Sequence, residues 1–431
     1  MFFTNSDNMQ PGDDILRRFF EFERWQRALD TAVDKRINRA LLREMAKPET
    51  RIALYHAIAQ RRYSISPPRA VLIPKDRHGN YRMVYFNDPA DRVILAIVNE
   101  LFFNLTPDRL HPACKSYVTG IGTGQVVIEA SRHMAATSCQ NDVVGWKADL
   151  SKYFDSVPIE LIDRAFDMLE QRYGPSALVD MVRQYYHDNR YIDIDGKQAS
   201  KFMSLRQGCA VSAWLADVLL WHIDERLSHM CGYYVRYSDD MLYIGPDHQQ
   251  AMDVLMHELS QLSLSLNPDK VESLCSDRWF TFLGYSICGA QISLSPSRIK
   301  RFQRAIDRVT GTARDMAQAI NRVNRLLHHG RDDHSWARMV LPVINCRRDI
   351  DTLNAYVMDA IRAAHTGHCR IGGLGYNPQG IGHCIERGRG RHVASNLART
   401  PRWLEGYYTL RCMRKALKTS RAAYDTIVRQ L

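Results

Sequence analysis

The chain has 431 residues, of which 45% are hydrophobic, so it is long and apolar enough to bury a large core in two or three domains. Its formal net charge of +11 points to a polyanionic partner, and no apolar run is long enough to span a bilayer, so we expect no membrane association. Ten scattered cysteines form no CxxC pair and no zinc spacing, which favours a reducing, cytoplasmic setting.

The positive charge is concentrated in the last third of the chain. Residues 366–431 contain 12 Lys and Arg against 3 Asp and Glu, and residues 296–365 contain 13 against 7. A solvated helix face explains part of this excess, but an asymmetry of this size favours nucleic acid as the partner.

The first part of the chain combines helical and strand patterns. "DDILRRFFEFERWQRAL" repeats apolar residues at close to helical spacing, which predicts a helical segment over residues 1–63. Pro67 and Pro68 end it, and "AVLIPK" and "YRMVYF" predict two strands joined by the turn "DRHGN". The apolar stretch at 90–105 is again typical of a helix.

The middle of the chain places acids between strand-like runs. "VVGWKAD" predicts a strand that ends at Asp149, and residues 159–190 read as helix. "SLRQGCAVSAWLADVLLWHIDERL" predicts a turn followed by one long apolar helix, and "YVRYSDDMLYIG" predicts a hairpin. "RWFTFLGYSIC" predicts one strand, and the pattern from 296 to 365 is mainly helical.

Asp239 and Asp240 are adjacent within apolar and aromatic residues, where burial and mutual repulsion are unfavourable without compensation. An ordinary turn could explain this pair alone. With Asp149 at the end of another strand, however, three carboxylates can meet at one edge of a sheet. Oxygen ligands suit Mg²⁺, and two such ions can activate a 3′-hydroxyl and stabilise a leaving pyrophosphate.

Seven motifs in order, between about residue 64 and residue 290, resemble those of a reverse transcriptase of the bacterial, group II intron-like branch. They read "IPKDRHGNYRMV", "DPADRVI", "KSYVTGIGTGQ", "KADLSKYFDSV", "LRQGCAVSAWLADVLL", "YSDD" with "LSLNPDKVE", and "FLGYSI". The motif "KSYVTGIGTGQ" lacks the family's Gly-Phe-Arg. The motif "LRQGCAVSAWLADVLL" has Arg-Gln-Gly where intron enzymes commonly have Pro-Gln-Gly. The motif "IPKDRHGNYRMV" has Tyr-Arg-Met in place of the usual Arg-Pro.

The resemblance implies an α+β fold of the right-hand polymerase type, with a mixed or antiparallel palm sheet and a helical thumb. The domains it implies are an N-terminal helical extension at 1–63, fingers with the start of the palm at 64–148, a palm at 149–295, a helical thumb at 296–365 and a basic RNA-binding extension at 366–431.

The resemblance also implies the metal ligands. Asp149, Asp239 and Asp240 would hold two Mg²⁺ ions, and the Leu150 carbonyl would complete one coordination shell. For Asp240, a role in shaping the turn is the alternative.

The resemblance further assigns residues to the incoming nucleotide. Lys75 and Arg82 would bind the triphosphate, and Phe154 would exclude a 2′-hydroxyl. The alternatives are a solvated hairpin for the first two and core packing for Phe154. Gln207 and Gly208 would open a helix and allow close approach to the nascent base pair, or act only as a helix cap.

Lys270 would protonate the leaving pyrophosphate, unless it is an ordinary surface lysine. The expected partners are a structured noncoding RNA template, a DNA/RNA primer–template duplex and deoxynucleoside triphosphates (dNTPs), with the oligomeric state open.

By elimination, the chain looks like the "unknown group" of bacterial reverse transcriptases, many of them linked to phage defence. A group II intron-type or retron enzyme is the alternative within the family. A non-catalytic RNA-binding protein with a polymerase fold is the alternative outside it. An RNA-dependent RNA polymerase is disfavoured by Phe154, since such enzymes leave room for the 2′-hydroxyl.

Overall fold

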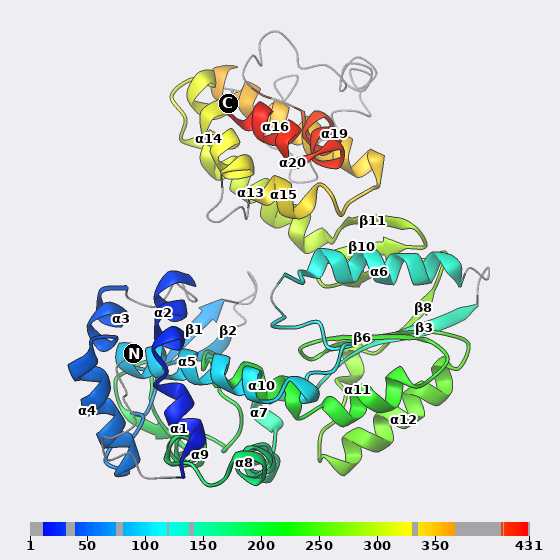
Figure 1. Ribbon diagram of the computed structural model, residues 1–431. Helices are drawn as coiled ribbons and strands as arrows, with labels where there is room; N and C mark the ends of the chain where they lie inside the picture. The colour runs from blue at the N-terminus through cyan, green and yellow to red at the C-terminus, as the bar shows by residue number, and fades with distance from the viewer. Residues whose placement is uncertain are drawn as a thin grey trace. The chain divides into compact units, whose positions relative to one another are not determined.

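The computed structural model describes residues 12–31, 39–74, 81–118, 120–137, 142–329, 335–366, 407 and 409–429. The chain forms two compact units, the first comprising residues 1–119 and 146–272 and the second residues 120–145 and 273–431. Helices and sheets occur in both units, in agreement with a mixed helix and sheet class (Figure 1). Within the described ranges, no helix combines the length and apolar character needed to cross a bilayer.

Helices make up most of the first unit, and those before residue 60 agree with the helical pattern of the sequence. They are α1 (Asp14–Phe19), α2 (Phe22–Thr31), α3 (Arg39–Met45), α4 (Pro48–Ala59), α5 (Pro89–Leu105), η1 (Pro107–Arg109), α7 (Tyr153–Ser156), α8 (Ile159–Tyr173), α9 (Ala177–His187), α10 (Val211–Val218), α11 (Trp221–Ser228), α12 (His248–Gln261) and η2 (Pro268–Lys270).

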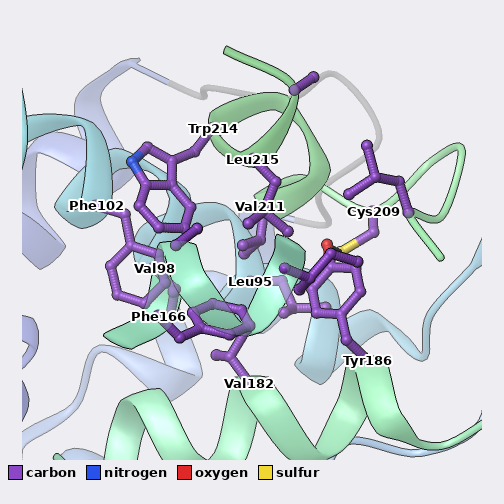
Figure 2. Close-up of a cluster of buried hydrophobic side chains, with 14 of the residues drawn as sticks. Leu95, Val98, Phe102, Phe166, Val182, Tyr186, Cys209, Val211, Trp214 and Leu215 are labelled. Atoms are coloured by element: carbon purple, nitrogen blue, oxygen red, sulfur yellow. Dashed lines mark hydrogen bonds between the residues drawn. The ribbon is translucent and has the colours of Figure 1, made fainter. Parts of the chain in front are cut away.

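Helix α5 lies in the hydrophobic core of the first unit. Pro89 occupies its first turn, where a missing N–H costs nothing, and apolar residues then cover most of its surface. The buried ring of Phe102 contacts Phe166 of α8 and Trp214 of α10, with ring centroids 6.4 and 4.9 Å apart (Figure 2). Burying one such side chain contributes roughly 1.5–3 kcal/mol, so this cluster holds α8 and α10 against α5.

The first unit contains a four-stranded sheet in the order β2-β1-β4-β5. The β1–β2 hairpin is antiparallel, as the sequence predicts. The β4–β5 hairpin was not predicted, although its turn "DIDGK" carries an Asp-Gly signal. Asp193 closes that turn, because its carboxylate accepts hydrogen bonds from the backbone of Asp195 and Lys197. The strands are β1 (Arg69–Pro74), β2 (Tyr81–Phe86), β4 (Arg190–Ile192) and β5 (Gln198–Ser200).

A second four-stranded sheet has the order β6-β7-β3-β8. Helices α11 and α12 pack on β6 and β7 and cover one face of this sheet (Figure 1). The Trp146 indole N–H donates to the His248 carbonyl at 2.8 Å and ties β3 to the start of α12. The strands are β3 (Val143–Asp149), β6 (Tyr233–Tyr237), β7 (Asp240–Ile244) and β8 (Glu272–Cys275).

The long apolar helix predicted after residue 208 is two helices, α10 and α11, separated at Leu219 and Leu220. Near the end of α10, the Arg236 guanidinium donates to the carbonyls of Ala216 and Asp217 at 3.3 and 3.2 Å. These side-chain bonds satisfy carbonyls that a continuing helix would use, so the helix can end there.

The second unit contains a three-stranded sheet, β11-β10-β9, on which α6 packs. The single strand predicted for "RWFTFLGYSIC" is two strands, β9 and β10. Leu283 and Gly284 have φ angles of 49° and 80°, and two successive residues with positive φ reverse the chain as in a tight hairpin. The elements are α6 (Thr123–Ala136), β9 (Phe280–Phe282), β10 (Tyr285–Cys288) and β11 (Gln291–Leu294).

A helical bundle follows the sheet in the second unit, as the pattern at 296–365 predicts. It does not stop at residue 365, because the described part of the tail packs into it. Tyr407 is buried and its hydroxyl donates to Asn354 at 3.1 Å, Arg411 pairs with Asp351, and His328 bonds to Tyr424. The helices are α13 (Pro296–Gly311), α14 (Met316–His328), α15 (Trp336–Val340), α16 (Arg347–Thr366), α19 (Leu410–Thr419) and α20 (Arg421–Val428).

Candidate active site

The hairpin turn between β6 and β7 carries two of the predicted acids. Tyr237 pairs with Asp240, which leaves Ser238 and Asp239 as a two-residue turn. Ser238 has a φ angle of 60°, a conformation that glycine adopts freely and that costs other residues about 1 kcal/mol or more. Backbone strain of this kind concentrates at functional sites.

Asp149 ends β3, the strand next to β7 in the sheet. The Leu150 amide donates to the Asp239 carbonyl at 3.4 Å, which ties the two segments together. Burial raises the pKa of Asp240 to about 6, and repulsion from Asp239 and then Asp149 adds to that rise. Burial and Asp149 likewise raise the pKa of Asp239. The three carboxylates are therefore close enough to repel one another.

Lys270 lies in this site rather than on a remote surface. It ends the short helix η2, and the Asn267 amide before it donates to the Asp149 carbonyl at 2.8 Å. The Lys270 ammonium contacts one carboxylate oxygen of Asp149 at 2.8 Å, and its side chain remains 55% exposed. A half-exposed lysine held at the carboxylates can compensate charge or donate a proton.

The three acids do not form a preassembled metal cage. Among the described residues, no group of three or more His, Cys, Asp or Glu side chains is arranged to hold a metal ion. The donor chemistry nevertheless fits Mg²⁺, because all three acids supply carboxylate oxygens. Burial and neighbouring carboxylates raise the pKa values of Asp239 and Asp240, so their negative charge is unfavourable here and a bound cation would compensate it.

A cavity of about 710 Å³ opens beside Asp239 in the first unit. Its volume is in the range of small-molecule sites. Arg82 of β2, Phe154 of α7 and Gln207 line it, together with Tyr117. The structure therefore brings together predicted residues that are up to 157 positions apart in the sequence, from Arg82 to Asp239.

Gln207 and Gly208 lie in the loop before α10, which begins three residues later at Val211, so they do not open the helix as predicted. The Gln207 side-chain oxygen is buried and has no hydrogen-bond partner, and it is therefore available to a ligand. Gly208 has a φ angle of 103°, and a Cβ there would lie 2.6 Å from the Tyr85 carbonyl. Glycine is therefore required at position 208 because the chain passes close to strand β2, and not because of a close approach to a base pair.

Leu150 is buried and pairs with Leu266 in an isolated bridge next to Asp149. Lys75 lies outside the described residues.

A buried charged network behind the turn was not predicted. Arg236 and Asp224 are both 0% exposed, and the guanidinium makes two bonds to the carboxylate, at 2.7 and 2.5 Å. The guanidinium also donates to the Ser238 carbonyl at 3.1 Å. Asp217 accepts from the Ser116 hydroxyl at 2.9 Å, and burial raises its pKa to about 6. The sequence does contain one indication of this network, an arginine inside the apolar run "YYVRY", since a buried charge needs a partner.

Part of the chain matches a known protein family. Residues 73–287 match the family described as reverse transcriptase (RNA-dependent DNA polymerase). A solved structure of apo telomerase from Candida tropicalis, truncated from the C-terminal domain, is similar at 15% identity and a TM-score of 0.40. That similarity covers 53% of this chain and 56% of the telomerase chain. No curated protein sequence matches the chain.

The matched segment contains the cavity, the three acids and Lys270. It is a nucleotidyltransferase domain. More particularly, residues 73–287 form a reverse transcriptase domain, that is, an RNA-directed DNA polymerase. Domains of this family generally use divalent metal ions.

Proposed function

We propose that this chain makes cDNA from a noncoding RNA template by nucleotidyl transfer at Asp149, Asp239 and Asp240. The cavity beside Asp239 carries the proposal, because Asp239, Phe154, Gln207 and Arg82 all line a volume suited to a small ligand, and the Gln207 side-chain oxygen is buried without a hydrogen-bond partner. Two Mg²⁺ ions bound by the three acids and the Leu150 carbonyl would activate the primer 3′-hydroxyl and stabilise pyrophosphate.

The protein's own groups would bind and orient the substrate. Arg82 can make a bidentate contact to the triphosphate, and Lys75, seven positions earlier in the sequence, would bind the same group. The unpaired Gln207 oxygen can accept a hydrogen bond within the cavity. Lys270 would leave Asp149 and give its proton to pyrophosphate.

We further propose that the chain belongs to the defence-associated "unknown group" of the group II intron-like branch. The order of the sequence motifs supports the group II intron-like branch, and the placement in the unknown group rests on elimination among the classes of that branch. A cytoplasmic location, a structured RNA and a primer–template duplex are parts of the same proposal.

Primer extension by the purified protein tests the function. We expect incorporation of dNTPs on a primed RNA template in the presence of Mg²⁺, and co-purifying RNA and cDNA of defined sequence in cells. A folded protein that binds primer–template but incorporates no dNTP would contradict the proposal and favour the non-catalytic alternative.

Phe154→Ala should let ribonucleotides compete. The ring lines the cavity, so its loss would make room for a 2′-hydroxyl. We expect the preference for dGTP over GTP on a fixed template to fall by about tenfold or more. Phe202→Ala is the matched control, because Phe202 is 64% exposed and does not line the cavity. An unchanged preference in Phe154→Ala would assign the ring to core packing alone.

Helix α13 should hold nucleic acid by its phosphates. It exposes Lys300, Arg304 and Arg308 at intervals of four residues, on one stripe of the helix. Changing all three to Gln should weaken primer–template binding and reduce the slope of log Kd against log salt by about two to three.

The matched control changes Arg314, Lys415 and Lys418 to Gln, which removes the same charge from exposed positions elsewhere. Binding and salt dependence are measured by fluorescence anisotropy at several salt concentrations. An equal loss in both triple variants would show a general charge effect and contradict a specific role for α13.

The basic tail remains a candidate surface for a structured RNA. Because Tyr407 is buried in the helical bundle, its ring cannot stack on RNA. The proposal therefore depends on the Arg-rich stretch before it, at 366–406, most of which lies outside the described residues.

A further inference from the structure

Tyr117 lines the nucleotide cavity from a segment where the motif resemblance fails. It belongs to "KSYVTGIGTG", which lacks the family's Gly-Phe-Arg, yet it shares the cavity with Phe154, Gln207 and Ser238. Tyr117 as a whole is 50% exposed, which is unusual for a large aromatic residue, and it is accessible to a ligand in the cavity.

The backbone of Tyr117 is strained. Its φ angle is 57°, in the left-handed region that a bulky residue adopts rarely. Ser238, beside it in the cavity wall, has a φ angle of 60°. Two strained residues in one wall, next to Asp239, indicate a conformation that the surrounding structure imposes.

Three contacts impose the position of Tyr117. Cys114 forms a parallel bridge with Arg236, and the Lys115 amide donates to the Arg236 carbonyl at 2.9 Å. The Ser116 hydroxyl then donates to the buried carboxylate of Asp217 at 2.9 Å. The residue before Tyr117 is thus fixed to α10, which holds the backbone of Tyr117 at the cavity wall.

The Tyr117 phenol also lies in the field of the acids. Burial raises its pKa, and the charges of Asp217 and Asp239 add to that rise, while a hydrogen bond with Ser238 opposes it. The phenol therefore stays neutral at physiological pH and presents an apolar ring with a polar tip.

We propose that Tyr117 is a further specificity-determining residue, whose ring contacts the sugar and base of the bound dNTP and narrows the cavity beside Ser238 and Asp239. The inference rests on the proposed function and assigns one more contact in the same site. An aromatic ring at this place would strengthen nucleotide binding by stacking and exclusion of water, independently of the metal ligands.

Tyr117→Gly and Tyr117→Phe test the proposal. Glycine suits the left-handed backbone, so its variant should fold at least as well as the wild type. We expect Tyr117→Gly to raise the KM for dNTPs, and the dNTP Kd in a ternary complex with a chain-terminated primer, by about tenfold. The Kd for primer–template should not change. Tyr117→Phe keeps the ring and should stay within about threefold of wild type.

Two control variants test whether an effect of Tyr117→Gly comes from relief of backbone strain, or from a change near residue 117, rather than from loss of a contact between the ring and the dNTP. Ser263→Gly relieves a similar φ angle of 55° at an exposed position away from the cavity, and Val118→Ala changes the exposed neighbour that does not line it. Both should leave dNTP binding unchanged. If the wild-type protein is active and Tyr117→Gly binds dNTPs with wild-type affinity, the inference about Tyr117 is overturned and the proposed function stands. A wild-type protein that neither extends a primer nor forms the ternary complex would overturn the proposed function with it.

Discussion

Replacing Asp239 by Asn should reduce dNTP incorporation by about a thousandfold or more while the protein stays folded. Asp239 lies in the β6–β7 turn and lines the cavity proposed for the nucleotide, and Asn keeps its shape while removing the charge. Single-nucleotide incorporation on a supplied primer–template measures the rate. Asp269→Asn is the control, since Asp269 is an exposed acid next to Lys270. Normal incorporation by a folded Asp239→Asn protein would remove Asp239 from the mechanism.

The same substitution should raise the melting temperature of the metal-free protein at neutral pH. Burial and repulsion from Asp149 raise the pKa of Asp239, so the folded state binds a proton more tightly than the unfolded state. The ionised carboxylate therefore destabilises the fold, and stability falls as pH rises from about 3.9, the usual Asp value, through the raised folded value. The increase in melting temperature caused by Asp239→Asn should vanish below about pH 3.9. A lower melting temperature for Asp239→Asn than for the wild type at pH 7 would contradict this account.

The local sequence predicts those parts of the fold that depend on local pattern. The β1–β2 hairpin, the buried helix α5 and the β6–β7 hairpin follow from alternation, apolar periodicity and turn residues. The sequence also predicts Arg82, Phe154, Gln207 and Asp239, which the structure places around one cavity. Motif order links these residues, because each lies at a fixed place in a recognised local pattern.

Features set by contacts distant in sequence were not predicted. The break between α10 and α11 coincides with hydrogen bonds from Arg236, which follows α10 by 18 residues or more. The tail helices join the bundle through contacts such as that of Tyr407 with Asn354, which composition does not reveal. Tyr117 gave no signal either, since an aromatic residue between polar neighbours is ordinary until the fold places it in a cavity.

Arg236 connects the core to the β6–β7 turn, and its replacement should have the largest effect on stability. Arg236→Met leaves the Asp224 carboxylate buried without its cation, which should lower the free energy of unfolding by about 3–5 kcal/mol. Arg172→Met is the matched control on α8, because Arg172 pairs with Asp108 at 2.6 Å and the two side chains are 47% and 49% exposed. That change should have little effect on the free energy of unfolding in denaturant titrations.

The double variant Arg236→Met/Asp224→Leu separates stability from positioning. With both charges removed, apolar packing should restore much of the lost stability, although the Tyr234 hydroxyl loses its acceptor on Asp224. The Ser238 carbonyl still lacks the guanidinium that donates to it at 3.1 Å, so the strained turn that carries Asp239 is less firmly held. We therefore expect a folded double variant with a lower kcat and a nearly unchanged KM for dNTPs. Wild-type kcat in that variant would show that Arg236 serves the core alone and does not position the turn.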